Sequence, residues 1–219
     1  MPSGLNVLKL LTPTLCFLLL VATPAIAQAD RKKMTEPEIA SLQQSVAVTA
    51  KNIKSLTADF AQYKHMDFLA KDMESTGKLV FKQPDKMLLQ YKKPYNYSES
   101  YINGKIHIND DGKKKDYDIG NSDVYRTVNK LIIGSVSGSL FNTGEFEVSY
   151  YKVGNNPVAV FVPHDPNLKK YMGRIELTFS PADASVTQVK IQDSETDFTR
   201  IVFKNRVTNG HIEDDVFRN

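Results

Sequence analysis

The feature that most constrains this chain is an alternation of apolar and polar residues, which recurs in short segments from Gly77 almost to the end. A side-chain period of two is typical of β-strands with one face buried and the other in water. The pattern predicts about ten antiparallel strands. These are Gly77–Lys82, Met87–Lys93, Tyr97–Ile102, Lys105–Asn109, Lys114–Ile119, Glu145–Val153, Val158–Pro163, Tyr171–Ser180, Ser185–Asp193 and Phe198–Val207.

Only one segment carries a strong helical pattern. Thr35 and Glu38 stand at the two positions of a capping box, and an apolar stripe at three- and four-residue spacing follows them. The stripe consists of Ile39, Leu42, Val46, Ala50 and Ile53. We expect residues 28–34 to be a flexible start, and Leu56 to Tyr63 to lead from the helix into the first strand.

A second, less regular segment runs from Asp123 to Leu140 and contains VYRTVNKLII followed by GSVSGS. Its spacing predicts one or two short helices ending at Gly134. So few helices leave most of the strands uncovered, and a flat sheet of this width curls or splits because its strands twist. We therefore predict a mainly β, α+β fold. One strongly curved antiparallel sheet forms an incomplete barrel, with the helices as plug or lid.

Three short stretches predict the turns between strands. Asn103-Gly104 is a strong signal for a two-residue hairpin, because both residues tolerate a positive φ. Asp110-Asp111-Gly112 indicates a second turn. Pro84 in Gln83-Pro84-Asp85 excludes a type I′ turn, because proline cannot adopt a positive φ, so a longer loop is expected there.

The length of the loop at 83–85 decides which side chains share a face. With three loop residues, Leu79 and Phe81 lie on the same face as the apolar residues of the next strand, namely Met87, Leu89 and Tyr91. With one residue more or fewer, the next strand turns its other face to the core. We favour the three-residue loop.

The N-terminal residues predict export. Lys9 precedes the apolar run LLTPTLCFLLLVA, and Ala25-Ile26-Ala27 matches a signal peptidase site. Residues 1–27 are therefore interpreted as a signal peptide, and residues 28–219 as one mature domain. The residues before Cys16 do not form a lipobox, which favours a product without a lipid anchor in the periplasm. Cleavage would remove the only cysteine and with it any thiol chemistry.

The remaining polar residues do not predict a catalytic, metal or cofactor site. The net charge of +3 is scattered, unlike the basic and aromatic surface that binds nucleic acid. The four histidines lie far apart without a ligand motif, and the serines at 135, 137 and 139 lack a GxSxG context. The strand lysines either meet a partner or solvate the sheet. The tyrosines at 91, 95, 97 and 101 either rim a cavity mouth or are ordinary strand aromatics.

The apolar face of the sheet has two interpretations. Alternation continues in the later strands, for example at Ile175 and Leu177, and again at Ile201 and Phe203. Such positions fill a solid core in most β proteins. The alternative is a partly hollow interior that holds a ligand.

Several short motifs, in order, resemble the LolA family of periplasmic outer-membrane lipoprotein carriers. They are LTADFAQ at 56–62, GKLVFKQP at 77–84, Asn103-Gly104-Lys105, and a closing strand at 199–206 that runs into Asn209-Gly210 and Asp215-Val216-Phe217. The similarity spans Leu42 to Phe217. No single motif is specific, but their order and spacing cover the whole mature chain.

The resemblance implies an incomplete barrel with a helical lid over an apolar cavity for acyl chains. We assign fourteen apolar residues to the wall of that cavity. They are Leu42, Val46, Phe60, Leu79, Phe81, Met87, Leu89, Tyr91, Leu131, Ile132, Phe146, Val148, Ile175 and Leu177. The segment at 123–140 corresponds to the lid.

Three positions depart from the family's pattern. The arginine before proline that tethers the lid in well-studied members corresponds here to Gln83, which is expected to contact the lid without a charge. Met87 and Leu89 stand where those members have Phe and Trp, so the wall is expected to be softer. Cargo transfer is compatible with these changes, whereas the arginine-controlled lid switch is not carried over.

Taken with the family, the residues predict a monomeric carrier of lipidated proteins or lipids with no enzymatic activity. An inner-membrane ABC release complex and an outer-membrane acceptor are the implied partners, and nucleic acid is not. The alternative is an envelope sensor or scaffold of the same fold that binds a protein segment on its concave face.

Overall fold

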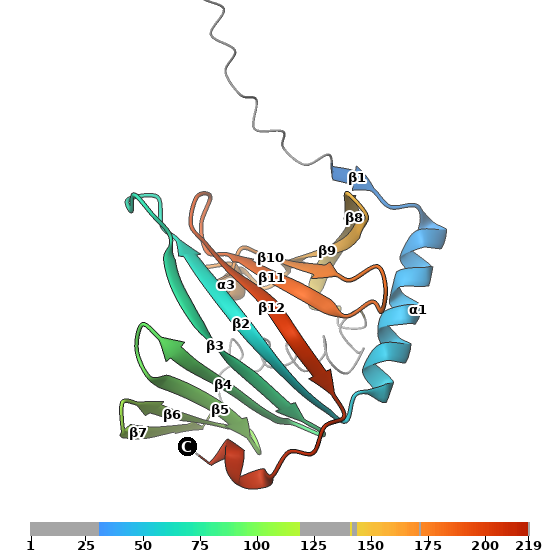
Figure 1. Ribbon diagram of the computed structural model, residues 1–219. Coiled ribbons are helices and arrows are strands. Elements are labelled where there is room, and N and C mark those ends of the chain that lie inside the picture. The colour runs from blue at the N-terminus through green and yellow to red at the C-terminus, as the bar shows by residue number, and fades with distance from the viewer. Residues whose placement is uncertain (1–30, 119–140, 142–143, 171, 219) are drawn as a thin grey trace, which may run out of the picture.

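The computed structural model describes residues 31–118, 141, 144–170 and 172–218, and these build one twelve-stranded sheet (Figure 1). Every neighbouring pair of strands is antiparallel. The strand order is β1-β8-β9-β10-β11-β12-β2-β3-β4-β5-β6-β7, so β1 and β7 are the edges and the sheet is not closed. The predicted fold class is confirmed.

The sheet consists of two consecutive meanders joined side by side. The first contains β2 (Ser55–His65), β3 (Met73–Lys82), β4 (Lys86–Lys93), β5 (Tyr97–Ile102), β6 (Lys105–Asp110) and β7 (Lys113–Asp118). The second contains β8 (Phe146–Val153), β9 (Asn156–Pro163), β10 (Arg174–Phe179), β11 (Val186–Gln192) and β12 (Phe198–Thr208). Pairing between β12 and β2 joins the meanders, and β1 (Arg31–Lys33) adds to β8.

Helix α1 (Glu36–Asn52) runs beside the curved sheet (Figure 1). As expected, it begins after Thr35, whose backbone N–H and hydroxyl both donate to the Glu38 carboxylate at 2.9 and 3.0 Å. Lys152 of β8 also pairs with Glu38 at 2.6 Å. The buried residues of α1 are Leu42, Val46 and Ala50. The predicted stripe is thus the face that packs on the sheet.

The inner face of the sheet carries two separate apolar clusters. The first cluster joins α1 to the second meander and includes Leu42, Phe161 and Phe179. The second cluster lies on the first meander and includes Phe60 and Phe81. A third, smaller cluster lies on the opposite face, where alternation along β3 and β4 places other side chains. The two inner clusters meet where β11 and β12 pair.

The predicted turns are confirmed. Lys82 pairs with Lys86 across a three-residue loop, so Phe81 faces Met87 and Leu79 faces Leu89, as the favoured register requires. Asn103 and Gly104 have φ values of 52° and 73°. At the next turn, Asp111 and Gly112 have φ values of 47° and 90°. These are the left-handed conformations that a two-residue hairpin needs.

The structure also differs from the prediction in several places. β3 begins at Met73 rather than Gly77, and β10 begins at Arg174 rather than Tyr171. Arg31–Lys33 is a strand rather than a flexible start, because its backbone pairs with β8. Two short helices were not predicted, α3 (Pro166–Lys169) and the 3-10 helix η2 (Asp214–Phe217). Each has only four residues, too few to show a helical period.

Two predicted segments, the signal peptide at 1–27 and the lid at 123–140, lie outside the described residues. None of the helices in the described ranges has both the length and the apolar character needed to cross a membrane.

Candidate functional site

An apolar cavity opens between α1 and the inner face of the sheet. Its empty space is about 1170 Å³, counting the part of the mouth that is open to solvent. The described residues that line it are Val46, Thr49, Ala50, Ile53, Leu56, Ala58, Leu79, Met87, Leu89, Met172, Ile175, Leu177, Ala184, Ser185, Val186, Val189, Ile191, Ile201, Phe203 and Arg206.

The cavity lies at the seam between the two inner clusters. The first cluster contributes Ile175, Leu177 and Val189 to the cavity wall, and these residues lie on β10 and β11. Leu79 and Ile201 belong to the second cluster, from β3 and β12. Alternation explains this wall, because every second residue of a strand faces the same side. Val46, Thr49 and Ala50 of α1 contribute the remaining side.

Six of the fourteen predicted wall residues line the cavity. They are Val46, Leu79, Met87, Leu89, Ile175 and Leu177. Six others pack in the inner clusters without being among the lining residues. They are Leu42, Phe146 and Val148 in the first cluster, and Phe60, Phe81 and Tyr91 in the second. Leu131 and Ile132 lie outside the described residues.

The prediction missed lining residues that carried a visible signal. Val189 and Ile191 alternate on β11, and Ile201 and Phe203 alternate on β12, so both strands were recognised as having an apolar face. Their place on the cavity wall depends on β11 pairing with β12 and on β12 pairing with β2. That arrangement cannot be read from periodicity. Thr49 and Arg206 carried no apolar signal at all.

A polar cluster lies at one part of the wall. The Arg206 guanidinium donates to the Ser185 hydroxyl and to the Asp183 carboxylate, the latter at 3.0 Å. The Ser185 hydroxyl donates to the other Asp183 oxygen at 2.5 Å. The Thr49 hydroxyl of α1 donates to the Asp183 backbone carbonyl at 2.7 Å. The cluster thus connects the helix, the turn between β10 and β11, and β12.

Asp183 is ionised in this cluster. Partial burial acts to raise its pKa, but hydrogen bonds from Ser185 and Ser180 and the charge of Arg206 outweigh burial and lower the pKa to about 2. Arg206 and Asp183 therefore cancel each other's charge at neutral pH.

The family assignment rests on a match that covers most of the chain. Residues 51–219 match the family model described as outer membrane lipoprotein carrier protein LolA. The chain belongs to the LolA family.

Several solved structures are similar to this LolA-family chain at low sequence identity. An uncharacterized conserved protein from Thermus thermophilus is 6% identical with a TM-score of 0.51, over 83% of this chain and 93% of that one. A putative outer membrane lipoprotein-sorting protein domain from Vibrio parahaemolyticus is 9% identical with a TM-score of 0.45, over 82% and 94%. A LolA superfamily protein from Nitrosomonas europaea is 7% identical with a TM-score of 0.44, over 81% and 96%. No curated protein matches the chain.

The position of the LolA lid arginine is exposed in this chain. Gln83 begins the loop after β3, and its backbone N–H donates to the Lys54 carbonyl at 2.8 Å. The lid that its side chain was expected to contact lies outside the described residues. The contact therefore stays a prediction.

Two of the four tyrosines between residues 91 and 101, Tyr91 and Tyr101, belong to the second cluster. The Tyr91 ring lies 5.7 Å from that of Tyr97, and Tyr97 donates to Glu99 at 2.5 Å. Burial and the nearby Glu99 charge raise the pKa of Tyr91 to about 12, so it stays a neutral donor to Gln62. None of the four tyrosines considered is among the described lining residues, which favours ordinary strand aromatics over a rim.

Proposed function

We propose that this LolA-family protein is a periplasmic carrier that holds acyl chains of lipoproteins, or of a related lipid, in the cavity between α1 and the sheet. The single observation that carries the proposal is the cavity itself. Seventeen of its twenty described lining residues are apolar, and the exceptions are Thr49, Ser185 and Arg206. Such a wall suits hydrocarbon and offers little to a polar substrate.

Energetics explain why such a carrier is needed. Burying one methylene is worth about 0.8 kcal/mol, so a chain of about 14 carbons costs on the order of 10 kcal/mol to hold in water. A lipid anchor therefore crosses an aqueous compartment only when a protein shields it. The wall is built largely of aliphatic side chains, which suits a carrier that also has to release its cargo.

We also propose a path for the cargo between the two membranes, and a binding role without catalysis. Cargo would be received from an inner-membrane ABC release complex and passed to an outer-membrane acceptor, the partners that the resemblance to the LolA family implies. Binding is non-covalent, and no residue of this cavity is assigned to catalysis. The protein is expected to act as a monomer.

A bulky side chain inside the cavity tests the proposal. Val189→Trp places an indole in the wall of β11, whereas Val202→Trp places the same group on β12, where alternation with Ile201 and Phe203 turns it to the opposite face. The wild-type protein and the Val202→Trp variant should take up a triacylated lipopeptide with equal affinity. Val189→Trp should weaken uptake at least about tenfold, because it occupies space needed by the chains.

Native mass spectrometry of protein taken directly from the periplasm provides the second readout. A retained lipid mass on the wild-type protein, lost on Val189→Trp, supports the carrier. Equal uptake by both variants would contradict it. A co-purified protein segment without any lipid would favour the sensor or scaffold function instead.

A further inference from the structure

Arg206 is the one charged residue among the lining residues in the described part of the chain. Its side chain is 19% exposed, whereas its partner Asp183 is 51% exposed. The guanidinium is thus the more buried member of the pair. Charged groups are rarely found against an apolar wall unless they are paired or functional.

A β-bulge directs Arg206 into the cavity. Lys204 pairs with Asp59 and Val207 pairs with Thr57, so Asn205 and Arg206 together stand opposite the single residue Ala58. Asn205 has a φ of 51°, the left-handed conformation found in such bulges. Strict alternation from Ile201 and Phe203 would have placed residue 205 inside and Arg206 outside. The extra residue reverses this order, and Asn205 instead donates to Asp59 at 2.8 Å.

Within the described residues, the guanidinium keeps donors available for a ligand. A guanidinium carries five N–H groups, and the contacts with Ser185 and Asp183 engage one nitrogen each. Its positive charge is already balanced by Asp183, and the two are held together through Ser185. The site therefore presents hydrogen-bond donors with little net charge beside a hydrocarbon wall.

We infer that Arg206 binds the uncharged carbonyl oxygen of an acyl ester or amide, and so positions the head of the acyl chain at this end of the cavity. A carbonyl oxygen accepts an N–H bond without bringing a charge. A carboxylate would have to compete with Asp183 for the same guanidinium and would be repelled by it. The inference rests on the proposed function and names its ligand class.

Three probes of equal chain length separate the head from the tail. They are methyl laurate, sodium laurate and dodecane, each measured by displacement of a fluorescent apolar dye from the wild-type protein. Wild type should bind methyl laurate more tightly than laurate. Arg206→Met should weaken methyl laurate by about five- to tenfold, the value of one hydrogen bond, while dodecane changes less than about twofold. Arg206→Lys should restore part of the loss, because it keeps donors at the same place.

Asp183→Asn provides the opposite change. It removes the balancing charge and leaves Arg206 positive, so laurate should gain at least about threefold relative to the methyl ester. Arg200→Met is the matched control. Arg200 lies on the same strand but stacks over the Tyr63 ring at 4.5 Å, outside the cavity wall, and its loss should leave all three affinities unchanged.

Two results would overturn the inference while leaving the carrier function standing. One is an equal loss of dodecane and ester binding in Arg206→Met. That result would mean that the cluster of Arg206, Asp183 and Ser185 only stabilises the fold. The other is a preference of the wild-type protein for laurate that disappears with Arg206, which would make the site an anion site. Failure of the wild-type protein to bind any of the probes would instead contradict the proposed function, and this inference with it.

Discussion

At the scale of single residues, Gly77 shows how closely two strands and a ring approach each other. A Cβ added at Gly77 would lie 2.2 Å from the Gln90 carbonyl oxygen and 2.5 Å from Cζ of Phe60. Phe60 is buried and makes an edge contact with Tyr91 at 5.0 Å between ring centroids. The absence of a side chain at Gly77 is therefore what lets the Phe60 ring approach β3 so closely.

Gly77→Ala should lower the free energy of unfolding by about 2–3 kcal/mol, because the closest of the clashing atoms is a backbone oxygen and cannot rotate away. Urea denaturation followed by circular dichroism measures the change. Gly144→Ala is the control. A Cβ there meets no atom of the described residues within 4 Å, and the expected change is within about 0.5 kcal/mol. Equal stability of the two variants would show that the close approach does not exist in solution.

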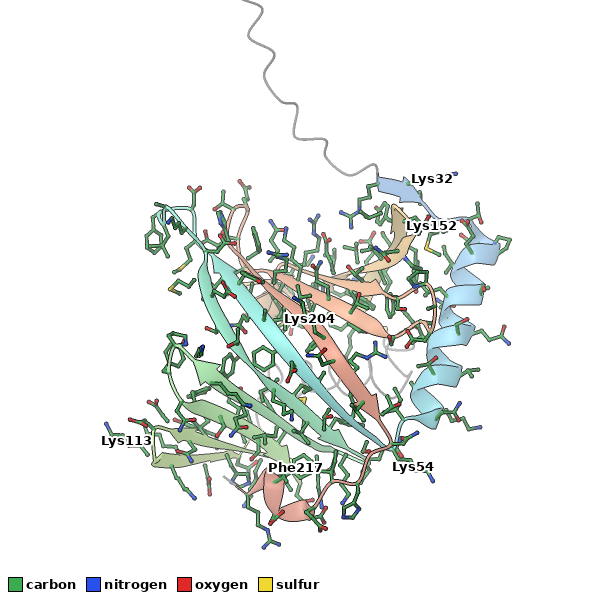
Figure 2. All side chains as sticks on the ribbon, in the orientation of Figure 1. Lys32, Lys54, Lys113, Lys152, Lys204 and Phe217 are labelled. Atoms are coloured by element: carbon green, nitrogen blue, oxygen red, sulfur yellow. The ribbon has the colours of Figure 1, made fainter. Side chains whose placement is uncertain are left out.

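At the scale of elements, the C-terminal segment packs on the face of the sheet opposite the cavity. Phe217 of η2 is fully buried and packs with Val80 and Leu88. Figure 2 labels Phe217 beside η2. Lys82 and Lys86 both pair with Asp214, at 2.6 and 2.7 Å. The sheet is thus covered on both faces at β3 and β4. This explains why Leu79 and Val80, neighbours in sequence, are both buried.

Phe217→Ala should lower the free energy of unfolding by about 3 kcal/mol, since it removes a buried ring and leaves a cavity under η2. Lipid uptake should be unchanged in the folded variant, because cavity and tail lie on opposite faces. Val216→Ala tests a neighbouring residue that is 42% exposed, and should cost less than about 0.5 kcal/mol. A loss of lipid uptake without a loss of stability would mean that the C-terminal segment with η2 affects the cavity on the opposite face.

The β-bulge at Asn205 is a feature of β12 that the alternation of apolar and polar residues does not predict. The strands and turns could be predicted because their signals are local, such as the period of two or the pair Asn103-Gly104. A period of two places Arg206 on the outer face, and only the pairing of β12 with β2 shows the extra residue. The same limit applies to β1, whose three exposed residues are placed by their pairing with β8.

At the scale of the whole molecule, the sequence predicted a curved open sheet but not how its two meanders meet. Leu42 and Val46 belong to one helical stripe, yet only Val46 lines the cavity. Leu42 packs in the first cluster with Phe146. Periodicity identifies the buried face of each element, whereas the position of a void depends on the distance between faces. That distance is set by long-range strand pairing and by the crossing of α1.

Side chains do not fill a ligand-binding cavity, so the empty protein lacks the packing contacts that filling it would provide. Ala50 of α1 is a small buried residue on its wall, and Ala47 is an exposed alanine one turn earlier. Ala50→Leu should raise the free energy of unfolding of the empty protein by about 1 kcal/mol, because leucine fills space that is otherwise unpacked. The same change should weaken uptake of the triacylated lipopeptide.

Ala47→Leu, with similar helix propensity, should change neither property. If Ala50→Leu destabilised the protein and left uptake unchanged, the space beside α1 would already be filled in solution, and the acyl chains would have to bind elsewhere.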